Sequence, residues 1–189
     1  VLCGLARAIP SDAGQRPPAE GSPVPPVVSA ATPPVSIISR DAAGAVTLRA
    51  ARLSAPLRID GRLDESLYQD VRPISDFVQA EPDEGRLATE RTELWLAFDD
   101  ENVYVVFRCF ETEPDRVVAK EMRRDNTSIY TGDDNVTFFF DTFRDLRNGF
   151  EFTVNPIGGR VDGQTTGERQ WNGDWNTVWD FKVGRFDGG

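Results

Sequence analysis

The chain has 189 residues, with 21 Lys and Arg against 31 Asp and Glu, no His and two Cys. The lack of His excludes Ser-His-Asp and Cys-His catalysis and any His-ligated zinc site. Two Cys are too few for a thiolate metal cage or a disulfide scaffold. A net charge of −10 argues against nucleic acid and anionic membranes as partners of the fold as a whole.

The first 45 residues differ in composition from the rest. They contain 8 of the 13 prolines and none of the aromatic residues. Residues 1–8 open with an apolar run and end in Ala6-Arg7-Ala8, a small-x-small pattern that predicts the end of a secretory signal peptide. A lipid-anchored Cys3 and a gene-start artefact are the alternatives. Residues 9–45 are predicted to be a Pro-rich disordered linker. No run is apolar enough to predict a transmembrane helix.

Residues 46–189 hold all the aromatic residues and read mainly as short strands. Thr92 to Phe98 alternates apolar and polar side chains, and a turn cluster of Asp and Asn separates it from a second strand, 103–110, which predicts a hairpin. Further strands are predicted at 136–140, 150–154, 158–166 and 175–186. Asn148-Gly149 predicts a tight turn before residue 150.

Little helix is expected in this part of the chain. Asp64 is positioned to cap a short turn that runs to Tyr68, and Asp115 to cap another that runs towards Met122. Many short strands spaced by turn residues predict an all-β fold, an antiparallel β-sandwich of jelly-roll-like type. In the apolar run of the second strand, Cys109 is expected to be a buried structural thiol.

Two of the three tryptophans close to the end of the sequence are candidates for contact with a sugar. Trp171 and Trp175 stand on either side of Asn172-Gly173-Asp174, where a loop would expose them. Indole faces cover the C–H faces of a pyranose, while Asn172 and Asp174 can hydrogen-bond its hydroxyls. Trp179 is expected to pack in the core, as is Trp95.

The acidic residues suit calcium better than catalysis. Asp141, Asp145 and Asn148 share one predicted loop and offer the oxygen ligands that calcium takes, although turn capping by Asp and Asn is the favoured explanation. Asp134 and Asp141 stand at the two ends of a strand, about 23 Å apart. A glycosidase pair needs carboxyls about 5–9.5 Å apart. Arg123-Arg124-Asp125 is expected to form an internal ion-pair element.

Several motifs occur in the order found in a known family. Residues 59–65, followed by Tyr68, resemble the opening "DG-x-LDE-xx-W" of family 9 carbohydrate-binding modules. The later matches are Phe77-Val78-Gln79 with Pro82 and Gly85, Thr89 to Glu93, Asn102 to Val105, Arg124-Asp125, Asp133-Asp134, Phe140-Asp141-Thr142, Asp145 with Asn148-Gly149, Phe152 with Asn155-Pro156 and Gly158, and Asp174-Trp175 with Trp179.

The resemblance covers residues 59–183. It is greatest to the N-terminal module of exported bacterial proteins that carry the domain of unknown function numbered 5916. It implies a β-sandwich that binds sugar, sometimes with structural calcium, without catalytic residues of its own. It also implies export to the periplasm, the outer membrane or the cell exterior, and a C-terminal domain that this chain lacks.

Two positions depart from the family pattern. Tyr68 stands where the family usually has Trp, and the chain stops at Gly188-Gly189, where the family continues with two more strands. An incomplete sandwich over 46–189 is therefore expected.

The leading hypothesis is a non-catalytic module that binds an oligo- or polysaccharide for a larger exported protein. A structural or periplasmic module of an outer-membrane β-barrel protein, with no sugar ligand, is the alternative. Part of a glycoside hydrolase is a third hypothesis, with less support, because nothing in the sequence marks a carboxyl of raised pKa beside a second carboxylate.

Overall fold

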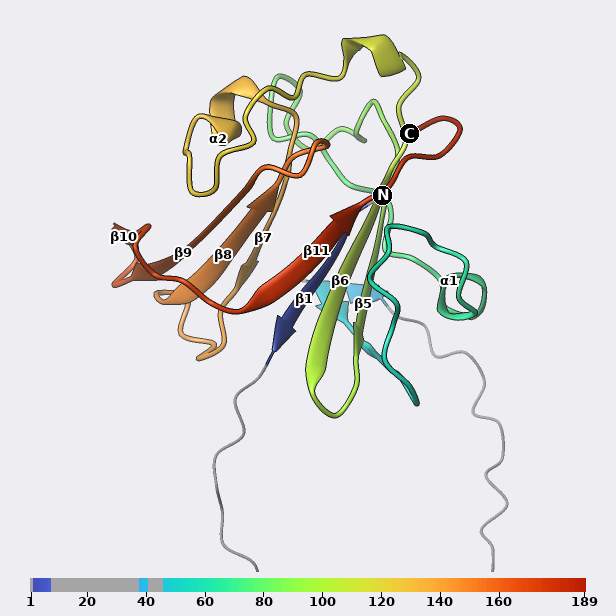
Figure 1. The fold of residues 1–189 in the computed structure, drawn as a ribbon, viewed down its shortest axis with the longest axis horizontal. Helices are drawn as coiled ribbons and strands as arrows, with labels where there is room; N and C mark the ends of the chain where they lie inside the picture. Colours follow the sequence, from blue (N-terminus) through green and yellow to red (C-terminus); the bar gives the residue numbers. More distant parts are fainter. Residues whose placement is uncertain (1, 8–37, 41–45) are drawn as a thin grey trace, which may run out of the picture.

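The computed structural model describes residues 2–7, 38–40 and 46–189, and in them the expected predominance of β-strands is confirmed (Figure 1). The strands are β1 Leu2–Arg7, β2 Ile38–Arg40, β3 Val46–Leu48, β4 Ala51–Arg52, β5 Thr92–Phe98, β6 Asn102–Cys109, β7 Val136–Phe140, β8 Gly149–Val154, β9 Arg160–Thr166, β10 Gln170–Asn172 and β11 Trp179–Val183. The helices are α1 Leu67–Asp70, the 3₁₀ turn η1 Pro114–Arg116, and α2 Ile129–Gly132.

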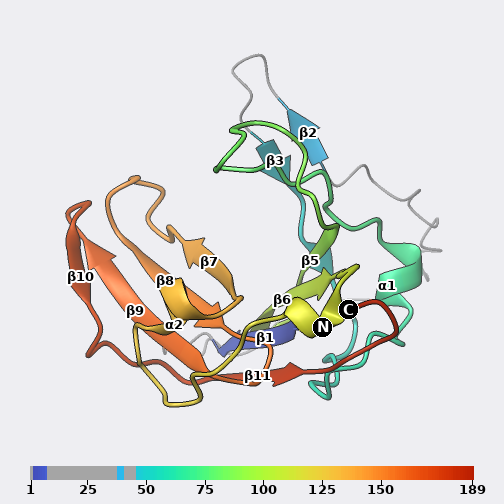
Figure 2. The same ribbon diagram turned by 90° about the horizontal axis from the view of Figure 1, so that it is seen from above.

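The strands form two larger sheets and a small one. The five-stranded sheet has the order β11-β1-β6-β5-β4, the four-stranded sheet the order β10-β9-β8-β7, and β2 pairs with β3. Seen from above, the two larger sheets lie on different sides of the molecule (Figure 2). All pairs are antiparallel except β4 with β5. The purely antiparallel expectation therefore fails at this one edge, where β4 adds two residues alongside β5.

The predicted hairpin of β5 and β6 is confirmed. The strands pair from Thr92 opposite Cys109 to Phe98 opposite Val103. Asp99 closes the turn, because its Oδ1 accepts hydrogen bonds from the backbone N–H groups of Glu101 and Asn102 at 2.8 and 2.7 Å. The buried Tyr104 hydroxyl donates to the second oxygen of Asp99 at 2.5 Å. The turn cluster read from the sequence thus fixes the register of the hairpin.

One apolar core lies between the two larger sheets. From β8, Phe152 stacks on Phe138 of β7 with ring centroids 5.2 Å apart, and its ring meets Trp179 of β11 edge-on at the same distance. Across the sheets, Phe107 of β6 lies 6.1 Å from Phe138. Trp179 is 5 % exposed, as expected of a core residue. Alternate residues of β7 and β8 in the four-stranded sheet thus face alternate residues of β6 and β11 in the five-stranded sheet.

A second group of buried side chains lies on the other face of the five-stranded sheet. Trp95 is 2 % exposed and donates its Nε1–H to the carbonyl of Val71 at 2.9 Å. Its ring is packed edge-on against Tyr68, with centroids 5.4 Å apart. The structural role expected for Trp95 is confirmed. The segment that contains α1 covers this face of the sheet.

The short helices differ from those expected. Residue Ser66 precedes α1, and Asp64 instead pairs with Arg58, whose Nη2 lies 2.7 Å from its carboxylate. After Asp115, helical geometry ends at Arg116 and does not continue towards Met122. No helix was predicted from the sequence where α2 occurs. Ser128 precedes α2 and makes no side-chain capping hydrogen bond.

The β7–β8 connection is longer than the tight turn expected at Asn148-Gly149. Positive φ angles occur at Arg144 and Leu146, at 54° and 56°, whereas Gly149 already belongs to β8. Capping carboxylates account for this: Asp141 accepts from the backbone of Leu146 at 2.7 Å, and Asp145 from that of Asn148 at 2.9 Å. Carboxylates, rather than an Asn-Gly dipeptide, therefore shape the loop.

The N-terminal predictions fall mostly on residues outside the described ones. Residues 2–7, interpreted from sequence as part of a signal peptide, form β1 between β6 and β11. Residues 38–40, inside the predicted linker, form β2; residues 8–37 and 41–45 lie outside the described part. Signal cleavage therefore stays a prediction. Among the helices of the described part, none is long and apolar enough to cross a membrane.

Candidate functional site

Trp175 belongs to the core between the sheets. Its half-buried ring stacks on Phe150 with centroids 4.7 Å apart and planes 27° apart, and it meets Phe152 edge-on at 6.2 Å. Phe150 and Phe152 are the core-facing residues of β8. The indole of Trp175 is thus committed to packing on the inner face of the four-stranded sheet.

An ion pair between the partly exposed Arg124 and a buried carboxylate holds the loop that carries Trp175. Asp162, fully buried on β9, accepts from Nη2 of Arg124 at 2.8 Å and from the backbone of Thr177 at 3.2 Å. Arg124 also donates to the side-chain carbonyl of Asn176 at 2.5 Å and pairs with Asp125 at 3.2 Å. The ion-pair element expected at 123–125 is confirmed, and Asp162 is the partner that the sequence left unidentified.

Trp171 lies on the opposite face of the same sheet. It is part of β10, opposite Thr165, and 40 % of its surface is exposed. Its ring rests on Gly163, where a methyl group would come within 2.0 Å of the indole. Gly163 pairs with Glu151, which alternates along β8 with the core-facing residues. Trp171 and Trp175 therefore do not form one site.

A second exposed ring, Phe139 of β7, lies on this outer face. Phe139 is 48 % exposed, and its ring rests on Gly149, where a methyl group would come within 2.2 Å. Gly149 is two residues from Glu151 and so faces the same side. We use "outer aromatic face" for Phe139, Trp171, Glu151 and the two glycines beneath the rings. The sequence signal for Phe139 is the run Phe138-Phe139-Phe140, in which the middle side chain must point away from its neighbours.

Polar groups lie beside the two rings. Glu151 is half-buried, and it pairs with Phe139 of β7 on one side and with Gly163 of β9 on the other. Tyr130 of α2 brings its phenol next to Glu151 and Thr153, and burial, followed by the Glu151 carboxylate, raises the pKa of Tyr130 above its usual range. The outer aromatic face thus combines apolar rings with the Glu151 carboxylate, while the Tyr130 hydroxyl is buried beneath the surface.

The two polar residues predicted to bind sugar, Asn172 and Asp174, lie at the end of β10 and in the turn after it. Asn172 is exposed and pairs with Gln164. Gln164 pairs in turn with the core-facing Phe150, so Asn172 is not on the outer face of the sheet. Its carbonyl oxygen accepts from the backbone of Asp174 at 3.1 Å, so the two residues build the turn after β10. Of the four residues proposed from sequence, only Trp171 belongs to the outer aromatic face.

The predicted calcium ligands do come together in the β7–β8 loop. Asp141, Asp145 and Asn148 are all engaged in hydrogen bonds within it: Asp145 accepts from the amide of Asn148 at 2.5 Å, and both carboxylates accept from backbone N–H groups. These backbone hydrogen bonds, with the Asn148 amide and the Arg147 charge, lower the pKa of Asp145. No group of three or more His, Cys, Asp or Glu in the described part is arranged to hold a metal ion. Calcium binding stays a prediction.

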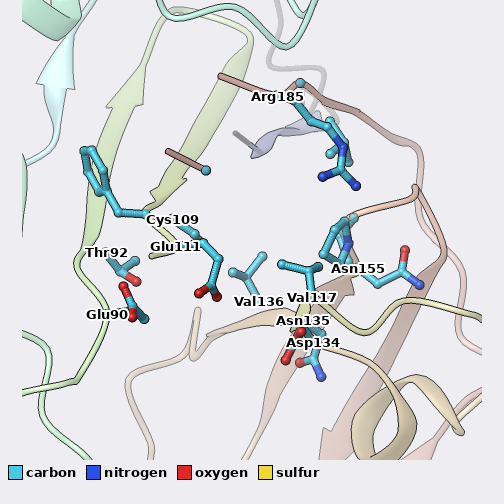
Figure 3. Close-up of a pocket in the computed structure, with 16 residues that line it drawn as sticks. Glu90, Thr92, Cys109, Glu111, Val117, Asp134, Asn135, Val136, Asn155 and Arg185 are labelled. Carbon is cyan, nitrogen blue, oxygen red and sulfur yellow. The ribbon is translucent and has the colours of Figure 1, made fainter. Parts of the chain in front are cut away.

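A cavity of about 310 Å³ lies at one end of the core, among the ends of β5, β6, β7, β8 and β11. Figure 3 shows Glu90, Cys109 and Glu111 along one wall of the cavity and Val117, Asp134 and Val136 along a second wall. Arg185 lies at the opposite end of the view. Cys109 is half-buried, and burial raises the pKa of its thiol. The thiol is thus protonated at neutral pH, but Cys109 is less buried than the sequence predicted and lines the cavity.

Comparison of the chain with family models, with curated proteins and with solved structures found no match in any of the three.

Proposed function

We propose that this chain is a non-catalytic carbohydrate-binding module and that the outer aromatic face is its binding surface. The observation that carries the proposal is the pair of exposed rings, Phe139 and Trp171, each resting on a glycine of a neighbouring strand. Gly149 and Gly163 lie diagonally across β8 and β9. Two adjacent rings on one sheet face form a platform for the C–H faces of a glycan.

The glycines matter because they fix the height and tilt of the rings. Without a Cβ beneath it, each ring lies against the backbone instead of projecting into solvent. A ring held in this way loses little rotational freedom when a ligand stacks on it, so less of the stacking free energy is spent on ordering the side chain. Two exposed rings without such seating would be weaker support for a binding surface.

The polar groups supply what a sugar needs at its edges. Glu151 offers carboxylate oxygens that accept hydrogen bonds from hydroxyls, whereas the Tyr130 hydroxyl beside it is buried and helps to position Glu151. A mostly apolar surface with a few placed polar groups is typical of small-molecule sites. The negative charge of Glu151, together with the net charge of −10, favours neutral over anionic glycans.

The wider setting of the proposal rests on the family resemblance. A jelly-roll-like sandwich, export, and a place in a larger bacterial protein all agree with a module that brings its parent protein to a glycan. Those parts are expectations from the sequence, and the outer aromatic face gives them a specific surface to test.

The test is isothermal titration of the full chain with a panel of neutral oligosaccharides, with Trp171→Ala as the variant. Loss of one stacking ring should weaken binding at least tenfold, which corresponds to about 1.4 kcal/mol. Phe143→Ala is the matched control, because Phe143 is a 70 % exposed aromatic residue in the β7–β8 loop and not on the platform. Its affinity should equal that of the parent chain.

A second variant separates ring position from ring identity. In Gly163→Ala the new methyl group pushes the Trp171 ring away from its position on the sheet. Binding should therefore weaken even though Trp171 itself is unchanged. Gly132→Ala, where a methyl group meets nothing within 4 Å, is its control. Absence of heat with every neutral glycan, or equal affinity in Trp171→Ala and the parent, would contradict the proposal.

A further inference from the structure

The cavity at the end of the core is continuous with the apolar interior. Val136, Val154 and Val183 line it and belong to the same core cluster as Phe107 and Phe152. A ligand that enters the cavity would therefore extend the core between the two sheets. The volume of about 310 Å³ is at the lower end of the range for small-molecule sites. The occupant that fits is a small molecule with an apolar body.

Hydrogen bonds hold the walls of the cavity in place. On one wall, the backbone N–H of Glu111 donates to the carbonyl of Gly188 at 2.9 Å. On the second wall, the N–H of Asp134 donates to the carbonyl of Val118, and the N–H of Val118 donates to the Asp134 carboxylate, each at 2.7 Å. These bonds would have to break before the walls could close. The cavity is therefore preformed, and little free energy is spent on ordering it when a ligand binds.

Charged side chains of both signs lie on different sides of the cavity. Glu90 and Glu111 belong to one wall, and Arg185 lies at the opposite end of the view in Figure 3. Among the described residues, none of these three side chains takes part in an ion pair. The third acidic side chain of the lining, Asp134, is engaged by the backbone of Val118. The cavity thus offers an unmatched cation and two unmatched carboxylates to a ligand.

We propose that this cavity binds a small zwitterion with an aliphatic body, of the class of an apolar dipeptide. Its carboxylate pairs with Arg185, its ammonium group pairs with Glu111 and Glu90, and its side chains lie against the valines. In a free α-amino acid both charged groups are attached to one carbon. In a dipeptide a peptide unit separates them, as charges on different sides of a cavity require. The site is separate from the outer aromatic face, so either can fail without the other.

Isothermal titration of the full chain with leucyl-leucine tests the site. The free dipeptide should bind, and its N-acetylated and C-amidated forms should each bind at least tenfold more weakly, because each lacks one charge-assisted contact. Arg185→Gln should bind the free dipeptide at least tenfold more weakly than the parent does, yet bind the C-amidated form with the parent's affinity. Glu111→Gln should show the same pattern with the N-acetylated form. The two variants thus assign each end of the ligand to one side of the cavity.

Arg72→Gln and Glu84→Gln are the matched controls, because both side chains are exposed and neither lines the cavity. Both controls should bind leucyl-leucine as the parent does. Three results would overturn the proposal. The first is the absence of both heat and a rise in melting temperature with the free dipeptide. The second is equal binding of the free and the blocked dipeptides, and the third is equal affinity of the parent and Arg185→Gln for the free dipeptide.

Discussion

Tyr104, which is hydrogen-bonded to Asp99, makes the free energy of unfolding depend on pH in the alkaline range. Burial, and then the hydrogen bond to Asp99, raises the pKa of Tyr104 to about 12. The unfolded chain releases this proton near pH 10, whereas the folded chain keeps it until about pH 12. The contribution is therefore complete below pH 10 and is lost as pH rises from 10 to 12.

We predict that Tyr104→Phe is less stable than the parent at pH 8 and loses less stability between pH 10 and 12. Urea unfolding at a series of pH values measures both effects. Tyr130→Phe is the comparison, because the pKa of Tyr130 is also raised but its phenol lies in the other sheet's environment, beside Glu151. Parallel pH profiles for the parent and Tyr104→Phe would show that Tyr104 does not titrate in this range.

At the same scale, four positions separate Trp171 from Trp175, yet the two rings lie on opposite faces of a sheet. A loop signal such as Asn172-Gly173-Asp174 predicts a change of chain direction. It does not predict on which side the chain returns, because Phe150 and Asp162, residues distant in sequence, determine where Trp175 and its loop pack. The sequence therefore identified one platform residue, Trp171, and missed the second.

At the scale of elements, the β7–β8 loop is shaped by the acidic residues that also suggested calcium. Asp141 accepts from the backbone N–H groups of Asp145 and Leu146 at 3.2 and 2.7 Å. Each such bond stabilises the fold by about 1 kcal/mol. The loop geometry by itself thus gives these carboxylates a structural role.

We predict that Asp141→Ala lowers the free energy of unfolding by about 1–2 kcal/mol, by the same amount with calcium and with a chelator. Chemical denaturation of parent and variant under both conditions provides the measurement, and Asp115→Ala, a change of an exposed carboxylate in η1, serves as control. If calcium stabilises the parent but not Asp141→Ala, the loop is a calcium site.

Strands were more predictable than helices for a physical reason. Alternation of apolar and polar side chains over β5 and β6, with Asp99 at the turn, is local information that the hairpin itself uses. The helices α1 and α2 are four residues each and make no side-chain capping bond. Such short helices exist because the tertiary structure holds them, and no local pattern marks them.

At the scale of the whole molecule, Phe152 connects the rings of three strands. It stacks on Phe138 and meets Phe140, Trp175 and Trp179 edge-on. Removing this ring leaves a cavity between the four rings that it contacts.

We predict that Phe152→Ala lowers the free energy of unfolding by about 3–5 kcal/mol. Denaturation followed by both far-UV and near-UV circular dichroism measures the loss and shows whether the strands and the aromatic packing are lost together. Phe143→Ala, which removes a 70 % exposed ring, should change stability little. Separate far-UV and near-UV transitions would mean that unfolding is not two-state, so that no single free energy of unfolding describes the variant.

The four tryptophans differ in exposure, so the intrinsic fluorescence of the protein can report on one of them. Trp95 and Trp179 are 2 % and 5 % exposed, and Trp175 is stacked on a phenylalanine, whereas Trp171 is 40 % exposed. Long-wavelength emission, and its quenching by a dissolved quencher, will therefore come mainly from the residue at the centre of the proposed function. A glycan that covers the Trp171 ring should shift the fluorescence emission of the unlabelled protein to shorter wavelength and reduce its quenching.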